Sequence, residues 1–323
     1  MFNTRITELL KIKYPIMQGG MRRLGTPELA AAVSNAGGLG TVNAGNYPNV
    51  QQLRAAIRKV KSLTANPFCV NVSMVPTITP GEMIPDYFRV IAEEGVAAVE
   101  TAGRSPEEYV PLLKRAGIKL IHKVAAVKFA RKAEEVGADI VTIVGMECAG
   151  RPGPEEVSTL ILGNKTARTL AIPVFIAGGI ADGRGVVAAL ALGAEGVVMG
   201  TRFLATAECA LHPNFKEWML KASESDTILI QRSIKNTMRV MKNKTALISR
   251  EMESLGASPE ELLALNDGER FRRCQSNGDV DGGLFATGQS VGLIDWIKPV
   301  QAVIDDIVGE VETVMKRLNA AIQ

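Results

Sequence analysis

Histidine and cysteine are scarce in this sequence, with two and four residues respectively among 323. The two histidines lie far apart in the chain, so a His-rich metal site is not expected. The cysteines form no CxxC pair, which argues against both a zinc knuckle and a disulfide framework. Free thiols are typical of a reducing compartment, so we expect a cytoplasmic protein. The residues concerned are His122, His212, Cys69, Cys148, Cys209 and Cys274.

The sequence also lacks a surplus of charge and a long apolar run. Its 37 Lys and Arg against 34 Asp and Glu give a net charge of +3 without a basic run, so we expect no nucleic-acid partner. No window holds the roughly 20 unbroken apolar residues that a membrane span needs, so no membrane association is expected. The N-terminal segment MFNTRITELLKIKYP has neither the apolar core nor the cleavage site of a signal peptide. With 46% hydrophobic residues, the composition is that of a globular protein.

Eight short apolar segments of β type recur through the first two thirds of the chain, each followed by a turn and an amphipathic segment. Because these segments are apolar throughout rather than alternating, each is expected to be buried on both faces, as in a parallel sheet. Eight such βα units predict a (β/α)8 TIM barrel. The predicted strands are Pro15–Gln18, Leu39–Asn43, Phe68–Val72, Ala97–Thr101, Lys119–Val124, Asp139–Val144, Val174–Ala177 and Gly196–Gly200.

The helices predicted between the strands carry capping signals. Thr26–Asn35 begins with Thr-Pro and stops at a Gly-Gly pair. Arg54–Leu63, Ala125–Val136 and Arg184–Leu192 follow the same pattern, and the last two stop at a glycine. A doubly wound open sheet is the competing architecture, but it usually carries a glycine fingerprint after its first strand. Here the glycines cluster after strands one, seven and eight.

The repeating pattern breaks after the eighth strand. Residues 211–271 contain no run that reads as a strand, and Ser258-Pro259-Glu260-Glu261 is typical of a helix start. We therefore predict a small, wholly helical subdomain at 211–271, appended to a barrel formed by 1–210 and 272–323. A final helix is predicted near Ala302–Ala320.

Glycines follow the seventh and eighth predicted strands, where barrels commonly bind a phosphate. Gly178 and Gly179 end the seventh strand, and Gly200 with Thr201 ends the eighth. Backbone N–H groups reach an anion best where no side chain intervenes. Two matched glycine sites on neighbouring strands favour a phosphate pocket over the alternative of simple tight turns.

The ends of strands one and five offer further candidates. Gly20 and Met21 follow strand one, where a flat ligand can lie against the main chain, although a tight turn would also use these residues. Lys123 ends strand five, and a lysine inside a barrel mouth is costly unless it meets an anion. Its alternatives are an outward-pointing side chain and an internal ion pair. The neighbouring His122 is expected to pack structurally.

Strand three ends in Asn71 and Ser73, which share one face and could bind a heterocycle or satisfy nearby backbone. Pro76 and Pro80 bracket a loop that could cover the pocket. After strand six, Cys148 has no partner histidine and is expected to be inert.

Together these segments resemble the nitronate monooxygenase (2-nitropropane dioxygenase) family of FMN-dependent TIM barrels, and most closely its NADH:quinone reductase branch. Enoyl-acyl-carrier-protein reductase II is related to this family. The resemblance spans nearly the whole chain in consistent order. The matching motifs are PIMQGGM (15–21), AAAVSNAGGLGT (30–41), PFCVNVSMVPT (67–77), HK (122–123), GMECAGRPG (145–153), AGGIADGRG (177–185), ALGAEGVVMGTRF (191–203) and GDVDGG…GQSVGLI (278–294).

The resemblance implies an FMN whose phosphate is held after strands seven and eight and whose ring lies against the end of strand one. Lys123 would then lie near the part of the ring that becomes anionic on reduction, as a fixed charge that tunes the cofactor. The implied cofactor-binding residues are Gly20, Met21, Ser73, Lys123, Gly150, Gly178, Gly179, Gly200 and Thr201.

One position departs from the family pattern. Nitronate monooxygenases and enoyl reductases of this family carry a histidine after the Ala-Gly or Gly-Gly of the strand-six motif, and here that position is Arg151. Arginine stays protonated near neutral pH, so it can bind an anion but cannot act as a general base. Lys123 and Arg151 are the candidate catalytic residues.

The resemblance therefore implies an FMN-dependent oxidoreductase with NADH or NADPH as reductant. The missing histidine and the ending Met74-Val75-Pro76-Thr77 favour a quinone reductase, which asks less of protein acid–base groups. Nitronate monooxygenase is the alternative, and enoyl thioester reduction comes third. From a different class, a non-redox phosphate-binding barrel would use the same glycines. We expect a small-molecule substrate, a quinone or a nitronate, and either a monomer or a homodimer.

Overall fold

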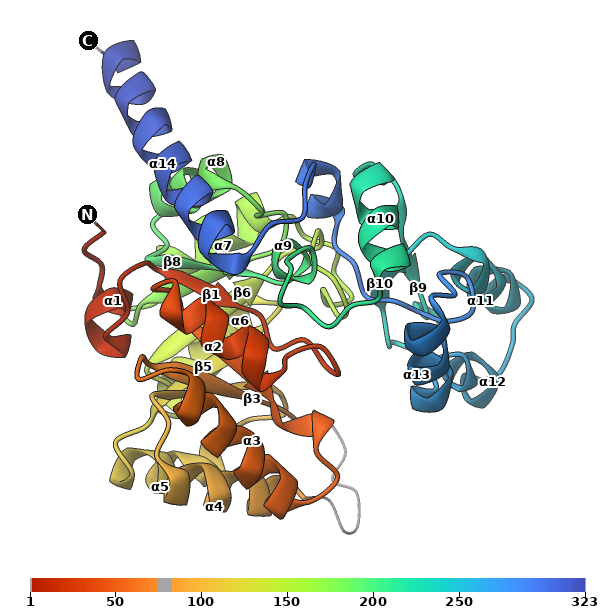
Figure 1. Ribbon diagram of the computed structural model, residues 1–323, viewed down its shortest axis with the longest axis horizontal. Helices are drawn as coiled ribbons and strands as arrows, with labels where there is room; N and C mark the ends of the chain where they lie inside the picture. Colours follow the sequence, from red (N-terminus) through yellow and green to blue (C-terminus); the bar gives the residue numbers. More distant parts are fainter. Residues whose placement is uncertain (1, 75–82, 323) are drawn as a thin grey trace.

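A computed structural model describes residues 2–74 and 83–322 of the chain, so the loop expected around Pro76 and Pro80 lies outside the described residues. Eight parallel strands alternate with helices around a barrel (Figure 1). The hydrogen-bonded order runs β1-β8-β7-β6-β5-β4-β3-β2. These strands are β1 Ile16–Gln18, β2 Gly40–Asn43, β3 Phe68–Met74, β4 Ala98–Gly103, β5 Lys119–Val124, β6 Ile140–Val144, β7 Val174–Ala177 and β8 Gly196–Met199.

The barrel closes between its first and second strands. Met17 and Leu39 form a parallel bridge. The Leu39 N–H donates to Ile16 O at 2.9 Å, and the Gln18 N–H donates to Leu39 O at 3.0 Å. Each of the eight predicted strands has its counterpart at the expected place, and the (β/α)8 barrel is confirmed.

Helices surround the strands, and the capping predicted from the sequence is present in several of them. Thr26 caps α2 by accepting from the Leu29 N–H, with Pro27 in the first turn. Ser258 and Glu261 form a reciprocal capping box at the start of α12. The longer helices are α2 Pro27–Asn35, α3 Val50–Leu63, α4 Ile84–Glu94, α6 Val127–Glu135, α7 Thr159–Ala167, α8 Gly183–Ala191, α10 Pro213–Lys221, α11 Lys244–Ser254, α13 Gly268–Asn277 and α14 Val300–Ile322. The shorter ones are α1 Arg5–Leu10, α5 Val110–Arg115, α9 Thr201–Leu204 and α12 Pro259–Ala264, with 3-10 turns η1 Ala44–Asn46, η2 Glu107–Tyr109 and η3 Gln289–Leu293.

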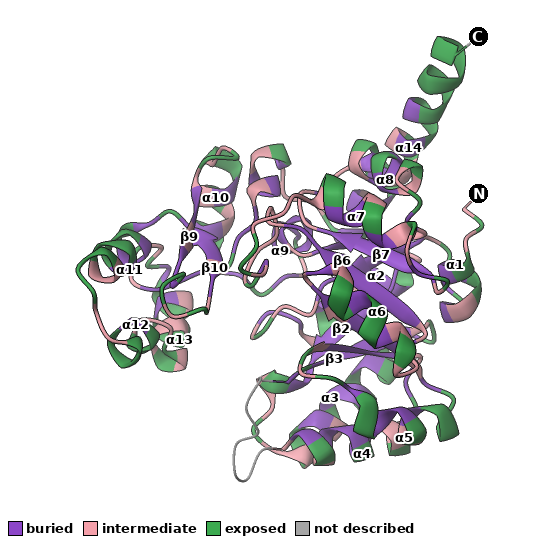
Figure 2. Cartoon of the chain, turned by 180° about the vertical axis from the view of Figure 1, so that it is seen from behind, coloured by how far each residue is buried: buried purple, intermediate pink, exposed green. Residues whose placement is uncertain are grey.

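Two layers of apolar side chains stabilise the barrel. One lies between the strands and the surrounding helices. The other fills the barrel interior, where Met17, Ile121 and Phe175 are fully buried together with Ile6 and Leu10 of α1. Figure 2 shows the strands as buried and the outer faces of α3, α4 and α6 as exposed. Because α1 packs into this inner core, it closes one end of the barrel and leaves the other end for a site.

The segment after the barrel corrects one prediction. Residues 211–271 are not wholly helical, because β9 Thr227–Ile230 and β10 Met238–Met241 pair as an antiparallel ribbon. Ile228, Ile230 and Val240 bury their side chains in a small core of their own with Ala246 and Leu284. The predicted boundary between 271 and 272 falls inside α13. None of the helices in the described residues is long and apolar enough to cross a membrane.

Candidate active site

The carboxyl ends of the barrel strands face the appended segment that contains β9, β10 and α10–α13 (Figure 1). This segment contacts the strand ends at several points. Gly150, just after β6, forms an antiparallel bridge with Arg239 of β10. Arg23, after β1, lies over the ring of Phe271 in α13 at 4.8 Å. We refer to the strand ends and their loops on this side as the rim.

A chain of polar side chains crosses the barrel interior just below the rim. Asn71 Nδ2 donates to Glu100 Oε2 at 2.5 Å, and Lys123 Nζ lies 3.2 Å from the same carboxylate oxygen. Asn43 Nδ2 donates to Asn71 Oδ1 at 2.9 Å, and Ser73 Oγ donates to Asn71 Oδ1 at 3.2 Å. Four neighbouring strands, β2 to β5, therefore contribute to one connected network.

The network holds a buried charge. Glu100 is fully buried, whereas the Lys123 side chain is 27% exposed. Glu100 Oε1 has no hydrogen-bond partner among the described residues. Lys123 thus forms the internal ion pair that the sequence left open as an alternative, and it still reaches the rim. Its ammonium group thus contacts the buried Glu100 carboxylate while the side chain remains partly exposed at the open end of the barrel.

Sequence reasoning missed Glu100 and Asn43, although Glu100 left a signal. The predicted strand AAVET holds one carboxylate among small and apolar residues. A charge in such a strand has to be paired, because burying an isolated carboxylate is very costly. In the register of the sheet, Ala102 of β4 lies opposite Lys123 of β5. Because residues two apart on a strand share a face, Glu100 and Lys123 both point into the barrel, offset by two residues along the strands.

The end of β1 packs directly on this network. A Cβ built at Gly20 would overlap the Asn71 side chain, whereas one at Gly19 would meet its nearest atoms at an ordinary 3.6 Å. Gly20 O also accepts from Asn43 Nδ2 at 3.2 Å. Met21 follows Gly20 and is half-buried. It begins a turn in which the Gly25 N–H donates to Met21 O at 2.6 Å. A glycine at position 20 is therefore required for the main chain after β1 to pack this closely on the Asn71 side chain.

The glycines after β7 and β8 form a cradle of main chain. Gly178 and Gly179 adopt φ of +101° and +74°, a region that side-chain-bearing residues rarely use. A Cβ at Gly200 would meet nothing within 4 Å, so open space lies beside its main chain. Within residues 2–74 and 83–322, the N–H groups of these three glycines donate to no other group. Unpaired donors beside open space suit an anionic ligand.

Thr201 lies next to this cradle, at the start of α9. Its hydroxyl oxygen accepts from the Gly288 N–H at 3.0 Å, and the side chain is buried. The hydroxyl proton is still available for donation. Glu147, after β6, has a structural role, because its carboxylate accepts from the Thr159 N–H at 2.9 Å and from Thr159 Oγ1 at 2.7 Å. It caps α7 and supports the cradle from the side.

His122 packs structurally, as expected. It is 4% exposed, and Thr101 Oγ1 lies 2.7 Å from its Nδ1. Burial, with a smaller contribution from the Lys123 charge, lowers the pKa of His122 to about 4. Desolvation raises the pKa of the Cys148 thiol to about 12, which is consistent with the expectation that this cysteine is inert. In the part of the chain that the structure describes, no three His, Cys, Asp or Glu residues gather as a metal site.

Arg151 follows Gly150 at the tip of the loop after β6, and its side chain is exposed. The pKa of Arg151 lies below its ordinary value, because the surrounding protein desolvates the guanidinium and because Arg22 repels it. Arg22 lies after β1.

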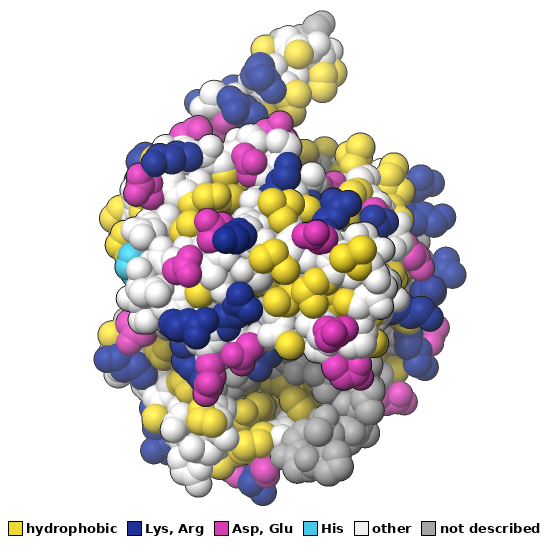
Figure 3. Space-filling model, turned by 90° about the vertical axis from the view of Figure 1, so that its right-hand side faces the viewer, with side chains coloured by type: hydrophobic (Ala, Val, Ile, Leu, Met, Phe, Trp, Pro, Cys, Tyr) yellow, Lys and Arg dark blue, Asp and Glu magenta, His cyan; other side chains and the backbone are white. Residues whose placement is uncertain are grey.

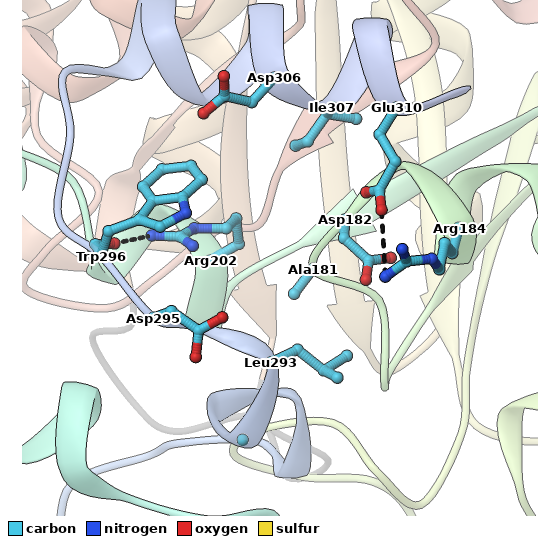
Figure 4. Close-up of a pocket in the computed structure, with 11 residues that line it drawn as sticks. Ala181, Asp182, Arg184, Arg202, Leu293, Asp295, Trp296, Asp306, Ile307 and Glu310 are labelled. Carbon is cyan, nitrogen blue, oxygen red and sulfur yellow. Dashed lines mark hydrogen bonds and ion pairs between the residues drawn. The ribbon is translucent and has the colours of Figure 1, made fainter. Parts of the chain in front are cut away.

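A separate pocket of about 280 Å³ lies outside the barrel, between the loops after β7 and β8 and α14 (Figure 4). Two of the arginines that line it have partners. Arg184 pairs with Glu310 at 3.2 Å, and Arg202 Nη2 donates to Trp296 O at 2.8 Å. The Arg202 guanidinium also stacks 4.4 Å from the Trp296 ring. This pocket lies between the barrel and its last helix, and it is separate from the rim site.

Comparisons with known proteins agree over nearly the whole chain. A family model described as nitronate monooxygenase matches residues 3–310. The (3aS,4S,5R,7aS)-5-hydroxy-7a-methyl-1-oxo-octahydro-1H-indene-4-carboxyl-CoA dehydrogenase of Rhodococcus jostii is 30% identical, over 98% of this chain and 97% of that protein. A probable nitronate monooxygenase of Staphylococcus aureus is 31% identical, over 97% and 98%. The structure of FabK from Thermotoga maritima superposes with a TM-score of 0.92 at 42% identity, over 99% of this chain and 100% of that one.

Proposed function

The chain belongs to the nitronate monooxygenase family of oxidoreductases, and we propose that it is an FMN-dependent enzyme that uses NADH or NADPH to reduce an α,β-unsaturated acyl thioester. The observation that carries the choice of acceptor is the full-length match to FabK, an enoyl reductase, at 42% identity. The name of the Rhodococcus relative, a carboxyl-CoA dehydrogenase, also specifies an acyl thioester. The two names share a thioester substrate, which the dehydrogenase oxidises and the enzyme proposed here reduces.

The residues at the rim fit FMN. The unpaired N–H groups of Gly178, Gly179 and Gly200 are suited to hold its phosphate, with the Thr201 hydroxyl beside them. Gly20 and Met21 offer main chain and a polarisable thioether to a flat ring. When bound, FMN supplies two-electron redox chemistry between a nicotinamide and an acceptor. The remaining proposed contacts come from Ser73, Lys123 and Gly150.

Lys123 supplies the positive charge of the site. The buried Glu100 fixes its ammonium 3.2 Å away, which limits its movement at the rim. Because one face of Lys123 remains exposed, it can still donate a hydrogen bond to a group that gains negative charge. The structure therefore supports a fixed, oriented cation rather than a group that exchanges protons with substrate.

Quinone reduction is the second candidate, and one observation favours it. His122 is buried below the rim, and His212 caps α10 by accepting from the Asn214 N–H. No imidazole therefore takes the place that Arg151 occupies. Reduction of a quinone places little demand on a neutral side-chain acid or base, whereas an enoyl thioester must receive a proton at its α carbon. Water would have to supply that proton.

Anaerobic stopped-flow on the purified holoenzyme separates these functions. The flavin absorbance near 450 nm is followed after mixing with NADH, NADPH or propyl nitronate. The reduced enzyme is then mixed with crotonyl-CoA or with a soluble quinone. Fast reduction by a nicotinamide followed by fast reoxidation with crotonyl-CoA is the expected result.

The other outcomes are equally clear. Reoxidation by the quinone alone would assign the second function and overturn the first. Reduction by nitronate but by neither nicotinamide would assign a nitronate monooxygenase, the name of the Staphylococcus relative. A purified protein without flavin, and unable to bind added FMN, would overturn all three.

A further inference from the structure

Arg239 of β10 is an arginine buried without a carboxylate partner. It is 4% exposed, and Arg202 is the only other arginine among the described residues that is buried. No carboxylate of the described residues forms an ion pair with Arg239. Because burying a charge without a pairing group is costly, its hydrogen bonds have to replace the lost hydration. The groups that accept these bonds therefore indicate the role of the side chain.

The pleat of β10 directs Arg239 toward the barrel. Met238 and Val240 share one face of the ribbon and pack in the small core of the appended segment. Arg239 and Met241 lie on the opposite face, and Met241 belongs to the core that surrounds the barrel strands. A shift of one residue in the pairing of β9 with β10 would turn Arg239 away from the barrel.

Both the guanidinium and the main chain of Arg239 bind the loop after β6, residues 145–151. Its Nε donates to Met146 O at 2.9 Å. The Arg239 N–H donates to Gly150 O at 2.7 Å, and the Gly150 N–H donates to Arg239 O at 3.0 Å. Nη1 donates to Thr227 Oγ1 of β9 at 3.0 Å, which orients the guanidinium. One arginine thus ties the loop to the ribbon near both of its ends.

A second segment holds the same loop between these two points. The Gln289 N–H donates to Glu147 O at 2.9 Å. The Gly288 N–H donates to Thr201 Oγ1 at 3.0 Å, beside the cradle. A Cβ at Gly288 would lie 2.8 Å from Glu147 O, so the two main chains approach closely. We refer to the contacts of Arg239 with the loop as the clamp; η3 supports the loop from the side of the cradle.

The clamped loop lies where the appended segment meets the open end of the barrel. Gly150 has a φ of +71°, and a Cβ built on it would meet nothing within 4 Å, so open space lies beside its main chain. Arg151 follows directly, with an exposed side chain. Figure 3 views the molecule from the side of the appended segment and shows a hollow below it. The two site residues of this loop therefore depend on the ribbon for their position.

We propose that Arg239 is a positioning residue, which holds the loop after β6 in the conformation that presents Gly150 and Arg151 to flavin and acceptor. The inference rests on the proposed function, because that function gives these two residues their role. Arg239 acts through the loop, since its printed bonds go to Met146 O and to Thr227 rather than to the space beside Gly150. A side chain outside the barrel would thus be required for chemistry at its mouth.

Amide hydrogen exchange of the purified protein tests the clamp without any turnover. R239M keeps an unbranched apolar side chain but loses both guanidinium bonds, whereas its main-chain bonds to Gly150 remain possible. We expect the amides of residues 145–151 to exchange about tenfold faster, with β2 and β3 unchanged. R239K can still donate to Met146 O and should restore part of the protection.

Two further variants keep the test specific. T227V removes the group that orients the guanidinium, and it should accelerate exchange at residues 145–151 less than R239M does. It carries the test if R239M fails to fold. R270M is the matched control, because Arg270 donates through Nε to Gly282 O and so removes a contact remote from this loop. Exchange at residues 145–151 in R270M should equal that of the parent.

Flavin binding and half-reaction kinetics measure the consequence for the site. In R239M we expect the Kd for FMN to rise about tenfold in fluorescence titration. In the flavin-saturated variant, reoxidation by crotonyl-CoA or the soluble quinone, whichever reoxidises the parent, should slow about tenfold or more. R239K should recover part of both losses, and R270M should show neither.

The outcomes separate this inference from the proposed function. Unchanged exchange at residues 145–151 in R239M, or equal effects of R239M and R270M, would overturn the inference. Faster exchange with unchanged flavin affinity and kinetics would also overturn it and leave the proposed function standing. A protein that binds no FMN but shows the faster exchange in R239M would overturn the proposed function and leave the clamp standing.

Discussion

Lys123 Nζ lies 3.2 Å from Glu100 Oε2, and the pair spans the boundary between the barrel interior and its mouth. Glu100 is fully buried, so its charge depends on Lys123 and on the amide of Asn71 for compensation. Lys123 is partly exposed, and its contact with Glu100 fixes the position of its ammonium group. A group that we propose as part of the flavin site is therefore also a structural requirement of the barrel.

Removal of the Lys123 charge should destabilise the fold. In K123Q the Glu100 carboxylate loses its cation inside the barrel, and we expect the free energy of unfolding to fall by about 2–3 kcal/mol. The double variant E100Q/K123Q should recover part of this loss, because no uncompensated charge remains. Urea denaturation of the flavin-free protein at pH 7 measures both values. Equal stability of K123Q and the parent would show that the pair is not coupled.

The contact between Gly20 and Asn71 gives a second prediction. In G20A the new methyl group overlaps the Asn71 side chain, and Asn71 can no longer both fill its place and donate to Glu100. We expect a loss of about 1–3 kcal/mol in stability together with a lower flavin content. G19A is the matched control, since its methyl group meets only ordinary contacts at 3.6 Å. If both variants behave alike in thermal denaturation and flavin content, the close approach has no consequence.

The barrel could be predicted from the sequence because its signals are local. Each strand is a continuous apolar run, and α2 carries its cap and its terminal glycines within a dozen residues. The cradle glycines were likewise predictable, since Gly178 and Gly200 end consecutive strands. Where a cap was less obvious, the prediction failed: α3 begins at Val50, four residues before the expected Arg54, because Asn49 accepts from the Gln52 N–H.

Features that depend on distant partners were not predictable in the same way. The ribbon of β9 and β10 consists of four-residue strands whose pairing, and the bridge from Arg239 to Gly150, become apparent only in the folded chain. The network from Asn43 to Lys123 depends on which face each strand turns inward. A shift of one residue in any of these strands would move its polar group out of the barrel.

The open space beside Gly200 gives a prediction about the cradle. G200A adds a methyl group that touches nothing within 4 Å, at a φ of −101° that alanine tolerates. The fold should therefore be unaffected, with a Tm within about 2 °C of the parent. If a phosphate occupies that space, FMN should bind about tenfold or more weakly, as measured by fluorescence titration. G309A, an equally open position in α14, is the control and should bind FMN as the parent does.

The buried His122 makes the stability of the protein depend on pH. Burial lowers its pKa from 6.5 to about 4 in the folded chain, so the unfolded chain takes up a proton first as the pH falls. Stability is therefore lost between about pH 6.5 and pH 4, and below that range both states are protonated and this contribution levels off. Of the loss between pH 7 and pH 5, we attribute about 2 kcal/mol to this residue.

The variants H122Q and H212Q separate this contribution from that of the carboxylates. In H122Q the loss of stability between pH 7 and pH 5 should be smaller than in the parent by about 2 kcal/mol, whatever the variant's stability at pH 7. H212Q, which removes the other histidine of the chain at the start of α10, is the matched control. Urea denaturation at the two pH values, with FMN at saturation, gives the difference for each protein. An unchanged loss in H122Q would mean that His122 is protonated in the folded barrel, in conflict with its burial beside Thr101 and Lys123.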